Sequence, residues 1–253
     1  MLGGCGVKKE KEADSELPKI VIGMDYFEPY SYQASDGEYK GIDVELAKEA
    51  FRRLGYRPKF ENIVWEDKDE LLADGTVDCL WSSYSMNGRE DKYQWAGPYL
   101  YSRQMVVVKN ESEIQTLSDL KGKRIAVQAT TKAEDLFLHN IKSDLPQMQQ
   151  VNCFSTTNEI YAALRKSYVD AIAGHEAMLG SLVKEGKDAY RMLDESIYKS
   201  ELGVAFKKGT HEEVAADLTE TLKKLQREGI TEKIVTKYGL DADEILPEGE
   251  QNE

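Results

Sequence analysis

The sequence predicts an α/β protein of two lobes, each a mostly parallel sheet flanked by helices, joined by a hinge of two strands. Short apolar segments alternate with amphipathic segments in each half of the chain, and this alternation is typical of parallel sheets covered by helices. Two further apolar segments, at residues 104–108 and 202–206, mark where the chain leaves the first unit and later returns to it. The length of 253 residues is sufficient for two modest lobes.

The first unit is expected to alternate strands and helices. Its expected strands are residues 20–23, 57–63 and 77–81. Its expected helices are residues 45–54 and 65–73, and the first of them carries apolar residues at helical spacing and ends at Gly55. Because the strands run in parallel, the loops after their carboxyl ends meet at one edge of the sheet, where we expect ligand contacts.

The second unit repeats this order. Its expected strands are residues 124–128, 150–154 and 169–173, and its expected helices are residues 132–140 and 157–166. Two more helices, at residues 212–228 and 231–238, close the folded part. We therefore expect a tether at residues 1–17, lobe 1 at residues 18–105 and 204–240, lobe 2 at residues 106–203, and an acidic tail at residues 241–253.

The composition excludes several classes of function. With 33 basic and 46 acidic residues the formal net charge is −13, which repels nucleic acid and anionic lipid surfaces. No apolar run approaches the roughly 18 residues that a membrane helix needs. The three histidines are scattered, and no glycine-rich phosphate loop is present. We expect a monomer that uses no cofactor or metal and has no nucleic-acid partner.

The cysteines predict a lipid anchor and no disulfide. The start of the chain, Leu2-Gly3-Gly4-Cys5, reads like the end of a bacterial lipoprotein signal, so we expect a lipid on Cys5 that holds the protein at the outer face of the cell membrane. The charged residues 8–16 would then serve as a tether. The alternative is a chance string of four residues. Cys79 and Cys153 lie in apolar, strand-like segments and are expected to be free buried thiols.

Five segments, in their order and spacing, resemble family 3 of the extracellular solute-binding proteins, the periplasmic amino-acid-binding proteins that feed ABC transporters. The segments are residues 39–47, 75–79, 89–99, 119–123 and 169–173, and the resemblance covers residues 19–240. It implies the periplasmic-binding-protein fold and an extracytoplasmic protein that closes around a small carboxylate-bearing solute, foremost an amino acid. It also implies delivery of this ligand to an ABC transporter permease, without catalysis.

The resemblance implies that one carboxylate of the ligand is shared by both lobes. Arg89 of lobe 1 corresponds to the arginine that grips the carboxylate, and a guanidinium fork suits a carboxylate better than a lysine does. Thr130 and Thr131 of lobe 2 resemble the second contact, at a helix start that favours an anion. The alternatives are a surface arginine paired with Glu90 or Asp91 and an ordinary helix cap.

Serine and aromatic residues complete the site that the resemblance implies. Ser83 and Ser85 occupy the segment that offers a carbonyl and a hydroxyl to the ligand, although this segment is one residue shorter than the commoner family pattern. Tyr26, Phe27 and Trp65 resemble the aromatic walls of the cleft. We expect Trp65 and one of the other two rings to face the ligand. The alternatives are serines that bond only to the backbone and aromatics that belong to the core.

The sequence departs from the family pattern at His175-Glu176. Many amino-acid binders of this family place an aspartate for the ligand's ammonium group where this chain has His175. Successive strand residues point to opposite faces, so only one of the two is expected to meet the ligand. If Glu176 faces the cleft, it satisfies the ammonium group; if His175 faces the cleft, the case for an amino acid is weaker. Asp25 is a further candidate at this site.

Two rival functions use the same fold. One is a dehydratase, since some relatives of this fold resemble enzymes that act on prephenate or arogenate; Glu176, His175 or Asp25 would then supply the acid. The other is a ligand-sensing module of a signalling system. No motif singles out an acid, and no signalling segment stands out, so the prediction remains a binding protein that is not an enzyme.

Overall fold

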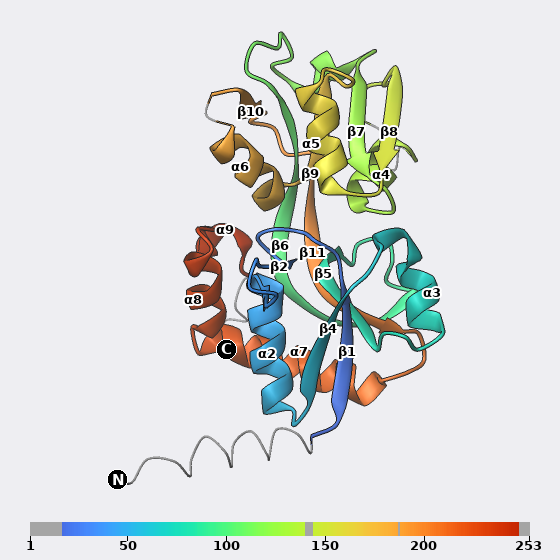
Figure 1. Ribbon diagram of the computed structural model, residues 1–253, viewed down its shortest axis with the longest axis vertical. Helices are drawn as coiled ribbons and strands as arrows, with labels where there is room; N and C mark the ends of the chain where they lie inside the picture. The colour runs from blue at the N-terminus through green and yellow to red at the C-terminus, as the bar shows by residue number, and fades with distance from the viewer. Residues whose placement is uncertain (1–16, 140–143, 187, 248–253) are drawn as a thin grey trace.

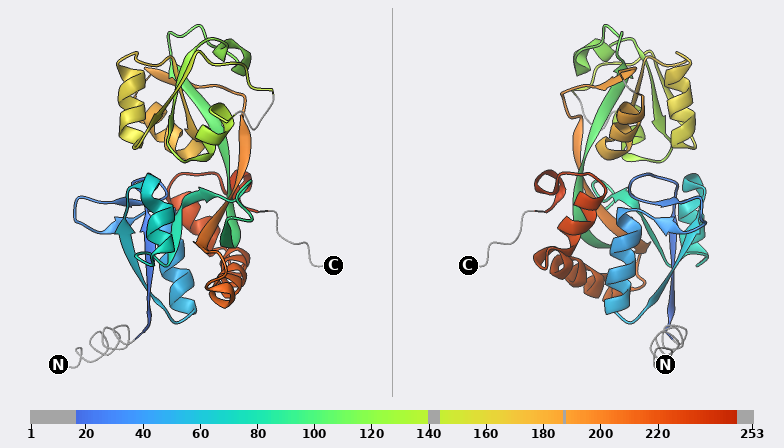
Figure 2. Two further views of the ribbon diagram at one scale, coloured as in Figure 1. Left: turned by 90° about the vertical axis from the view of Figure 1, so that its right-hand side faces the viewer. Right: turned by 60° about the vertical axis from the view of Figure 1, so that its left-hand side comes forward.

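Two lobes lie one above the other along the long axis of the molecule (Figure 1). The computed structural model describes residues 17–139, 144–186 and 188–247, so the expected lipid site at Cys5 lies outside the described residues. Two strands, β6 (Tyr93–Lys109) and β11 (Tyr198–Lys207), run from one lobe into the other. The side views show that both crossing strands lie toward one side of the molecule (Figure 2). No helix in the described ranges is long and apolar enough to span a bilayer.

Lobe 1 is built on parallel strands covered by helices. In its sheet, β1 (Lys19–Met24) lies between β4 (Arg57–Asn62) and β5 (Cys79–Ser85) and is parallel to both. β11 then adds to β5 in the antiparallel sense and β6 adds to β11. The remaining elements are β2 (Tyr32–Gln33), β3 (Tyr39–Lys40), α2 (Ile42–Arg53), the 3-10 turn η1 (Trp65–Asp67), α3 (Lys68–Ala73), α7 (Glu212–Arg227) and α8 (Ile230–Lys237).

The α2 helix shows why these residues form this layer. Its apolar residues recur every three or four positions, and the structure buries this stripe against the sheet. Phe51, in the last turn, is fully buried and packs edge-on against Trp81 of β5. Gly55 follows the helix with a φ of +76°, a left-handed conformation that glycine adopts without a steric penalty. The expected helix and its end are therefore confirmed.

Lobe 2 repeats the parallel arrangement. Here β7 (Arg124–Gln128) lies between β8 (Gln150–Phe154) and β9 (Ala171–His175) and is parallel to both. The other elements are the 3-10 turn η2 (Leu117–Leu120), α4 (Lys132–Phe137), α5 (Thr157–Arg165), α6 (Glu176–Glu185) and β10 (Tyr190–Met192). The two-lobed α/β fold predicted by the alternating pattern is thus confirmed.

β6 changes its partners as it crosses between the lobes. It pairs with β11 from Tyr93 to Gln104 and with β9 from Gln104 to Val108, both in the antiparallel sense. The strand is therefore much longer than the apolar segment at residues 104–108, because its first half is half-exposed and carries polar residues. A search for apolar runs does not detect a strand segment that contains many polar residues, so the start of β6 was not predicted.

Two boundaries differ from the expectation. The last strand of lobe 2 was expected at residues 169–173, but β9 runs from Ala171 to His175; Asp170 just before it still contacts Arg124 of β7 through its amide and its carboxylate. The segment after residue 240, expected to be an acidic tail, is also partly folded. The short helix α9 (Ala242–Ile245) occurs there, and Ile245 and Leu246 pack on the core.

Candidate functional site

The cleft between the lobes is lined by residues from both of them, at the carboxyl ends of the parallel strands. Lobe 1 contributes Asp25, Phe27, Trp65, Ser82, Ser83, Tyr84, Ser85 and Arg89, and lobe 2 contributes Gln128, Thr131, Lys132 and His175. The cavity volume, measured for the centre of a water molecule, is about 20 Å³. A single water needs about 10–15 Å³ by this measure, so the two walls lie nearly in contact and the lobes are closed.

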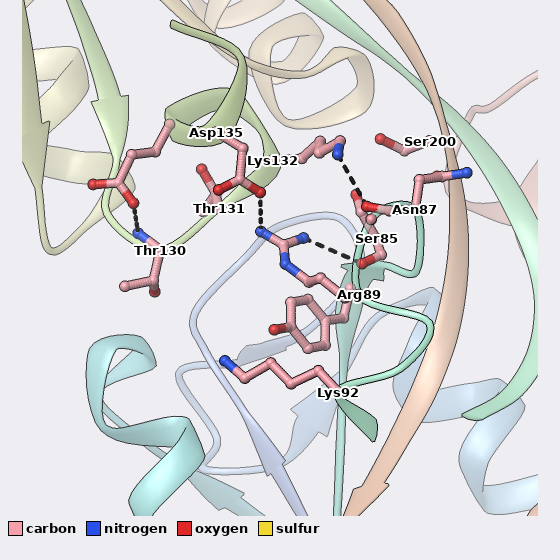
Figure 3. Close-up of polar contacts among 12 residues, drawn as sticks. Ser85, Asn87, Arg89, Lys92, Thr130, Thr131, Lys132, Asp135 and Ser200 are labelled. Atoms are coloured by element: carbon pink, nitrogen blue, oxygen red, sulfur yellow. Dashed lines mark hydrogen bonds and ion pairs between the residues drawn. The ribbon is translucent and has the colours of Figure 1, made fainter. Parts of the chain in front are cut away.

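Arg89 lies in the turn after β5 and reaches across the cleft (Figure 3). Its Nη2 contacts Asp135 Oδ2 of α4 at 2.6 Å, and its Nη1 donates to the Ser85 carbonyl oxygen at 3.2 Å. The guanidinium lies 5.1 Å from the centre of the Tyr84 ring, and only 11% of the side chain is exposed. Its ion pair is therefore with the other lobe and not with neighbouring Glu90, which instead accepts a bond from the Gly88 amide.

The opposite wall begins at the start of α4. Thr131 lines the cavity and donates its hydroxyl to the Gln128 carbonyl oxygen at 2.7 Å. Thr130 does not line the cavity, because its amide donates to Glu134 at 2.6 Å and its φ is +58°. The structure thus brings one of the two predicted threonines to the cleft.

Ser83 and Ser85 both present buried hydroxyl groups at the cleft wall; that of Ser83 lies within hydrogen-bonding reach of the Tyr30 hydroxyl, and that of Ser85 has no hydrogen-bond partner among the described residues. Ser83 has a φ of +50°, an uncommon conformation for a residue with a side chain. The buried carboxylate of Asp43 supports this kink, since it accepts the Ser83 amide at 2.6 Å and the Tyr99 hydroxyl at 2.8 Å. Burial raises the pKa of Asp43 to about 7. Buried polar groups without a partner call for an explanation, and a cleft wall offers one, namely a ligand.

Two of the three predicted aromatic residues line the cleft. Phe27 and Trp65 are both buried there, and the Trp65 ring meets the Tyr84 ring edge-on at 5.1 Å. Tyr26 does not line the cavity; it is 44% exposed and its hydroxyl donates to Glu28. The two adjacent rings point apart because the chain bends here, with Phe27 bridging back to Ser31.

His175 faces the cleft and Glu176 does not. The His175 ring is 6% exposed, lies edge-on to Phe27 at 5.6 Å, and its Nδ1 is 2.9 Å from Ser102 Oγ. Burial lowers the pKa of this imidazole to about 3, so it is neutral at pH 7. Glu176 begins α6, bonds to Arg103 at 2.5 and 2.7 Å, and borders a separate cavity of about 330 Å³ beside the hinge.

Asp25 is the carboxylate that lines the cleft. Its Oδ2 accepts Gln128 Nε2 from lobe 2 at 2.5 Å, and its Oδ1 accepts the Tyr26 amide at 2.7 Å. Burial raises its pKa, partly offset by these two hydrogen bonds. Because His175 and not Glu176 faces the cleft, the expected ammonium contact from Glu176 is absent, and Asp25 is the cleft carboxylate left to meet such a group while it also bonds across the cleft to Gln128.

Three residues on the lobe 2 wall were not predicted from the sequence. Gln128 and Lys132 line the cavity, and Asp135 pairs with Arg89. Lys132 and Asp135 are three residues apart, so they lie on one face of α4, directly after the predicted threonine loop. This spacing on one helix face was the feature of the sequence that could have predicted both residues.

The cleft lies between two hinged lobes, and both lobes supply polar groups to it. This arrangement is typical of two-lobed α/β proteins that enclose a small molecule. The chain belongs to the bacterial extracellular solute-binding proteins, family 3, whose family profile matches residues 20–241. The predicted family is therefore confirmed.

Several proteins are similar to this chain in sequence or in structure. The L-cystine-binding protein TcyJ of Escherichia coli (strain K12) is 26% identical over 227 residues, which cover 88% of this chain and 83% of that protein. The L-cystine-binding protein TcyA of Bacillus subtilis (strain 168) is 25% identical, over 87% of this chain and 80% of that protein. A substrate-binding protein of an ABC uptake transporter from Streptococcus pneumoniae, solved with bound histidine, has a TM-score of 0.79 and 26% identity, covering 94% of this chain and 98% of that one.

One structural neighbour is relevant to the rival enzymatic function. An ancestral amino-acid-binding protein, described as a precursor of cyclohexadienyl dehydratase, has a TM-score of 0.76 and 24% identity. At this identity the likeness shows a shared fold. The curated relatives named above are binding proteins.

Proposed function

We propose that this protein binds an amino acid or a related small carboxylate outside the cytoplasm and delivers it to an ABC transporter permease. The observation that carries the proposal is the lobe 1 wall of the cleft, where the buried guanidinium of Arg89 lies beside the buried hydroxyls of Ser83 and Ser85, and the Ser85 hydroxyl has no partner among the described residues. A guanidinium next to hydroxyl groups is a suitable receptor for a carboxylate. The names of the relatives, which bind cystine, glutamate, histidine or arginine, support the same class of ligand.

Closure of the lobes would couple this binding to transport. Lobe 1, proposed as residues 18–105 and 204–240, supplies Arg89, and lobe 2, proposed as residues 106–203, supplies Thr131 and Lys132. A ligand that contacts both walls binds the closed state better than the open state, and this difference in affinity shifts the population toward closure. The proposed hinge is the pair of crossing strands, β6 and β11.

The proposal is tested by a thermal-shift screen of the twenty amino acids and a panel of organic acids, with calorimetry on each hit. We expect at least one amino acid or carboxylate to raise the melting temperature and to bind with one-to-one stoichiometry. If no member of either panel binds while an unrelated class such as a sugar does, the proposal fails.

We further propose that the protein is not an enzyme. Glu176, one candidate acid, is held by Arg103, and His175 is buried and neutral, so Asp25 remains the one candidate of the three that could titrate in the cleft. The test is incubation with prephenate and arogenate. Appearance of phenylpyruvate or phenylalanine would contradict this.

We also propose an extracytoplasmic location with a lipid on Cys5, and a monomer in solution. The family is one of extracellular proteins, and the small residues Gly3 and Gly4 directly before Cys5 resemble the end of a bacterial lipoprotein signal. Mass spectrometry of the amino-terminal peptide from membrane fractions tests the lipid, and sedimentation tests the monomer. An unmodified Cys5 peptide in those fractions would contradict the anchor.

A further inference from the structure

Two lysines beside the cleft are almost fully buried and form no ion pair with any described residue. Lys132 is 4% exposed and Lys68 is 2% exposed. Lysines are almost never this deeply buried unless a carboxylate pairs with them, because an ammonium group loses its hydration on burial. Each has instead one hydrogen bond to a carbonyl oxygen, from Lys132 Nζ to Asn87 at 2.9 Å and from Lys68 Nζ to Trp65 at 3.4 Å.

Both lysines lie close to Arg89. The Lys132 Nζ reaches across the cleft to the turn that carries Arg89, where a Cβ on Gly88 would lie 3.5 Å from it (Figure 3). Lys68 and Arg89 share the ring of Tyr84, at 6.0 and 5.1 Å from its centre. Burial first, and then the charge of Arg89, lowers the pKa of Lys132. Burial lowers the pKa of Lys68 to about 8, so it still carries its charge at pH 7.

The carboxylates near these three cations are bonded to other groups. Glu90, which attracts Lys132, accepts the Gly88 amide, and Glu134, which attracts Lys68, accepts the Thr130 amide. Asp135 pairs with Arg89, and Asp25 on the cleft wall bonds to Gln128 and to the Tyr26 amide. Asp69, next to Lys68, bonds instead to Lys92 and Tyr93. The Lys132 ammonium is therefore a cavity-lining cation whose remaining donors have no carboxylate within ion-pair distance in the described part of the chain.

We propose that the cleft selects an acidic ligand, with one carboxylate at Arg89 and a second anionic group at Lys132. This inference rests on the proposed function and narrows it from amino acids and carboxylates in general to those with two acidic groups. Lys132 contacts the second group directly, because it lines the cavity, while Lys68 behind Trp65 and Tyr84 adds a favourable potential.

Pairs of ligands that differ in one charge test the proposal. Calorimetry at pH 7 compares glutamate with glutamine, aspartate with asparagine, and O-phosphoserine with serine. We expect the acidic member of at least one pair to bind more than tenfold tighter. Lys132→Met is expected to reduce this ratio to below threefold, with its fold checked by urea unfolding, and Lys132→Arg is expected to preserve most of the ratio.

Lys48, an exposed lysine with the same kinds of contact, offers a control outside the cleft. Its Nζ also donates to a backbone carbonyl, that of Tyr39, at 3.2 Å, and lies over an aromatic ring, that of Phe60, at 5.8 Å. Lys132 has the same two kinds of contact, with Asn87 and Tyr198. Lys48→Met is therefore expected to leave the ratio within each ligand pair unchanged.

Several outcomes overturn the inference. If the neutral member binds as tightly as the acidic member in all three pairs, the second charge is not recognised. If Lys132→Met weakens both members of a pair equally, Lys132 serves only to close the lobes. If none of the six compounds binds but a neutral zwitterion such as cystine does, this inference fails while the proposed function stands. If no amino acid or carboxylate of any kind binds, both fail.

Discussion

Replacement of Arg89 by alanine removes the group on which carboxylate binding depends. In the structure its Nη1 donates to the Ser85 carbonyl oxygen at 3.2 Å, which orients the guanidinium in the cleft, and its Nη2 lies 2.6 Å from Asp135, which a ligand carboxylate would displace. Truncating one partner of a buried, hydrogen-bonded charge pair costs about 2–5 kcal/mol of binding free energy. At about 1.4 kcal/mol per factor of ten, the dissociation constant should rise by about 30-fold to 3,000-fold. Arg89→Lys should recover only part of this, because it keeps the charge without the fork.

The assay is calorimetry with the tightest ligand from the screen, together with urea unfolding. Loss of the largely buried Asp135 pair should lower the free energy of unfolding by up to about 3–5 kcal/mol, and the urea titration therefore establishes first that the variant is folded. Arg124→Ala is the matched control, since Arg124 forms a similar ion pair with Asp170 within lobe 2. Unchanged affinity in a folded Arg89→Ala protein would refute the reasoning.

The remaining predictions concern the groups around Arg89. Asp135→Asn removes the carboxylate that pairs with Arg89 in this structure, so acidic ligands should bind more tightly, on the order of tenfold; weaker binding by calorimetry would show that Asp135 instead supports the site. His175 has its folded pKa lowered to about 3 by burial. Its contribution to stability is therefore complete above about pH 6.5 and is lost as the pH falls toward 3, by up to about 1.4 kcal/mol per pH unit. In urea titrations His175→Gln should be less sensitive to acid than the wild type, and an equal slope over this range would contradict the assignment.

The sequence predicted the architecture well because the apolar pattern is set by burial within each lobe. The strands at residues 20–23 and 124–128 and the helix ending at Gly55 occur as expected, since each packs against its neighbours in the chain. The hinge strand β6 was recognised only in part, because Tyr93 to Arg103 alternates buried and half-buried residues without an apolar run.

The candidate site was predicted less completely because it depends on contacts between lobes. Arg89 can be recognised from its place after a strand, but its partner Asp135 follows 46 positions later, in another lobe. The orientation of His175 depends on where β9 ends and α6 begins, a boundary that no local pattern sets. In the sequence Lys132 is an ordinary lysine at the start of a helix, and only the closed arrangement of the two lobes buries it.

The central claim is that one ligand is held by both walls, so that binding closes the lobes. Small-angle X-ray scattering of the protein, alone and saturated with the tightest ligand, tests it most directly. We predict that saturation reduces the radius of gyration toward the value calculated from the closed structure, and that Arg89→Ala abolishes this change at the same ligand concentration. Ligand binding established by calorimetry with no change in the radius of gyration, starting from a protein more extended than the closed structure, would contradict the account.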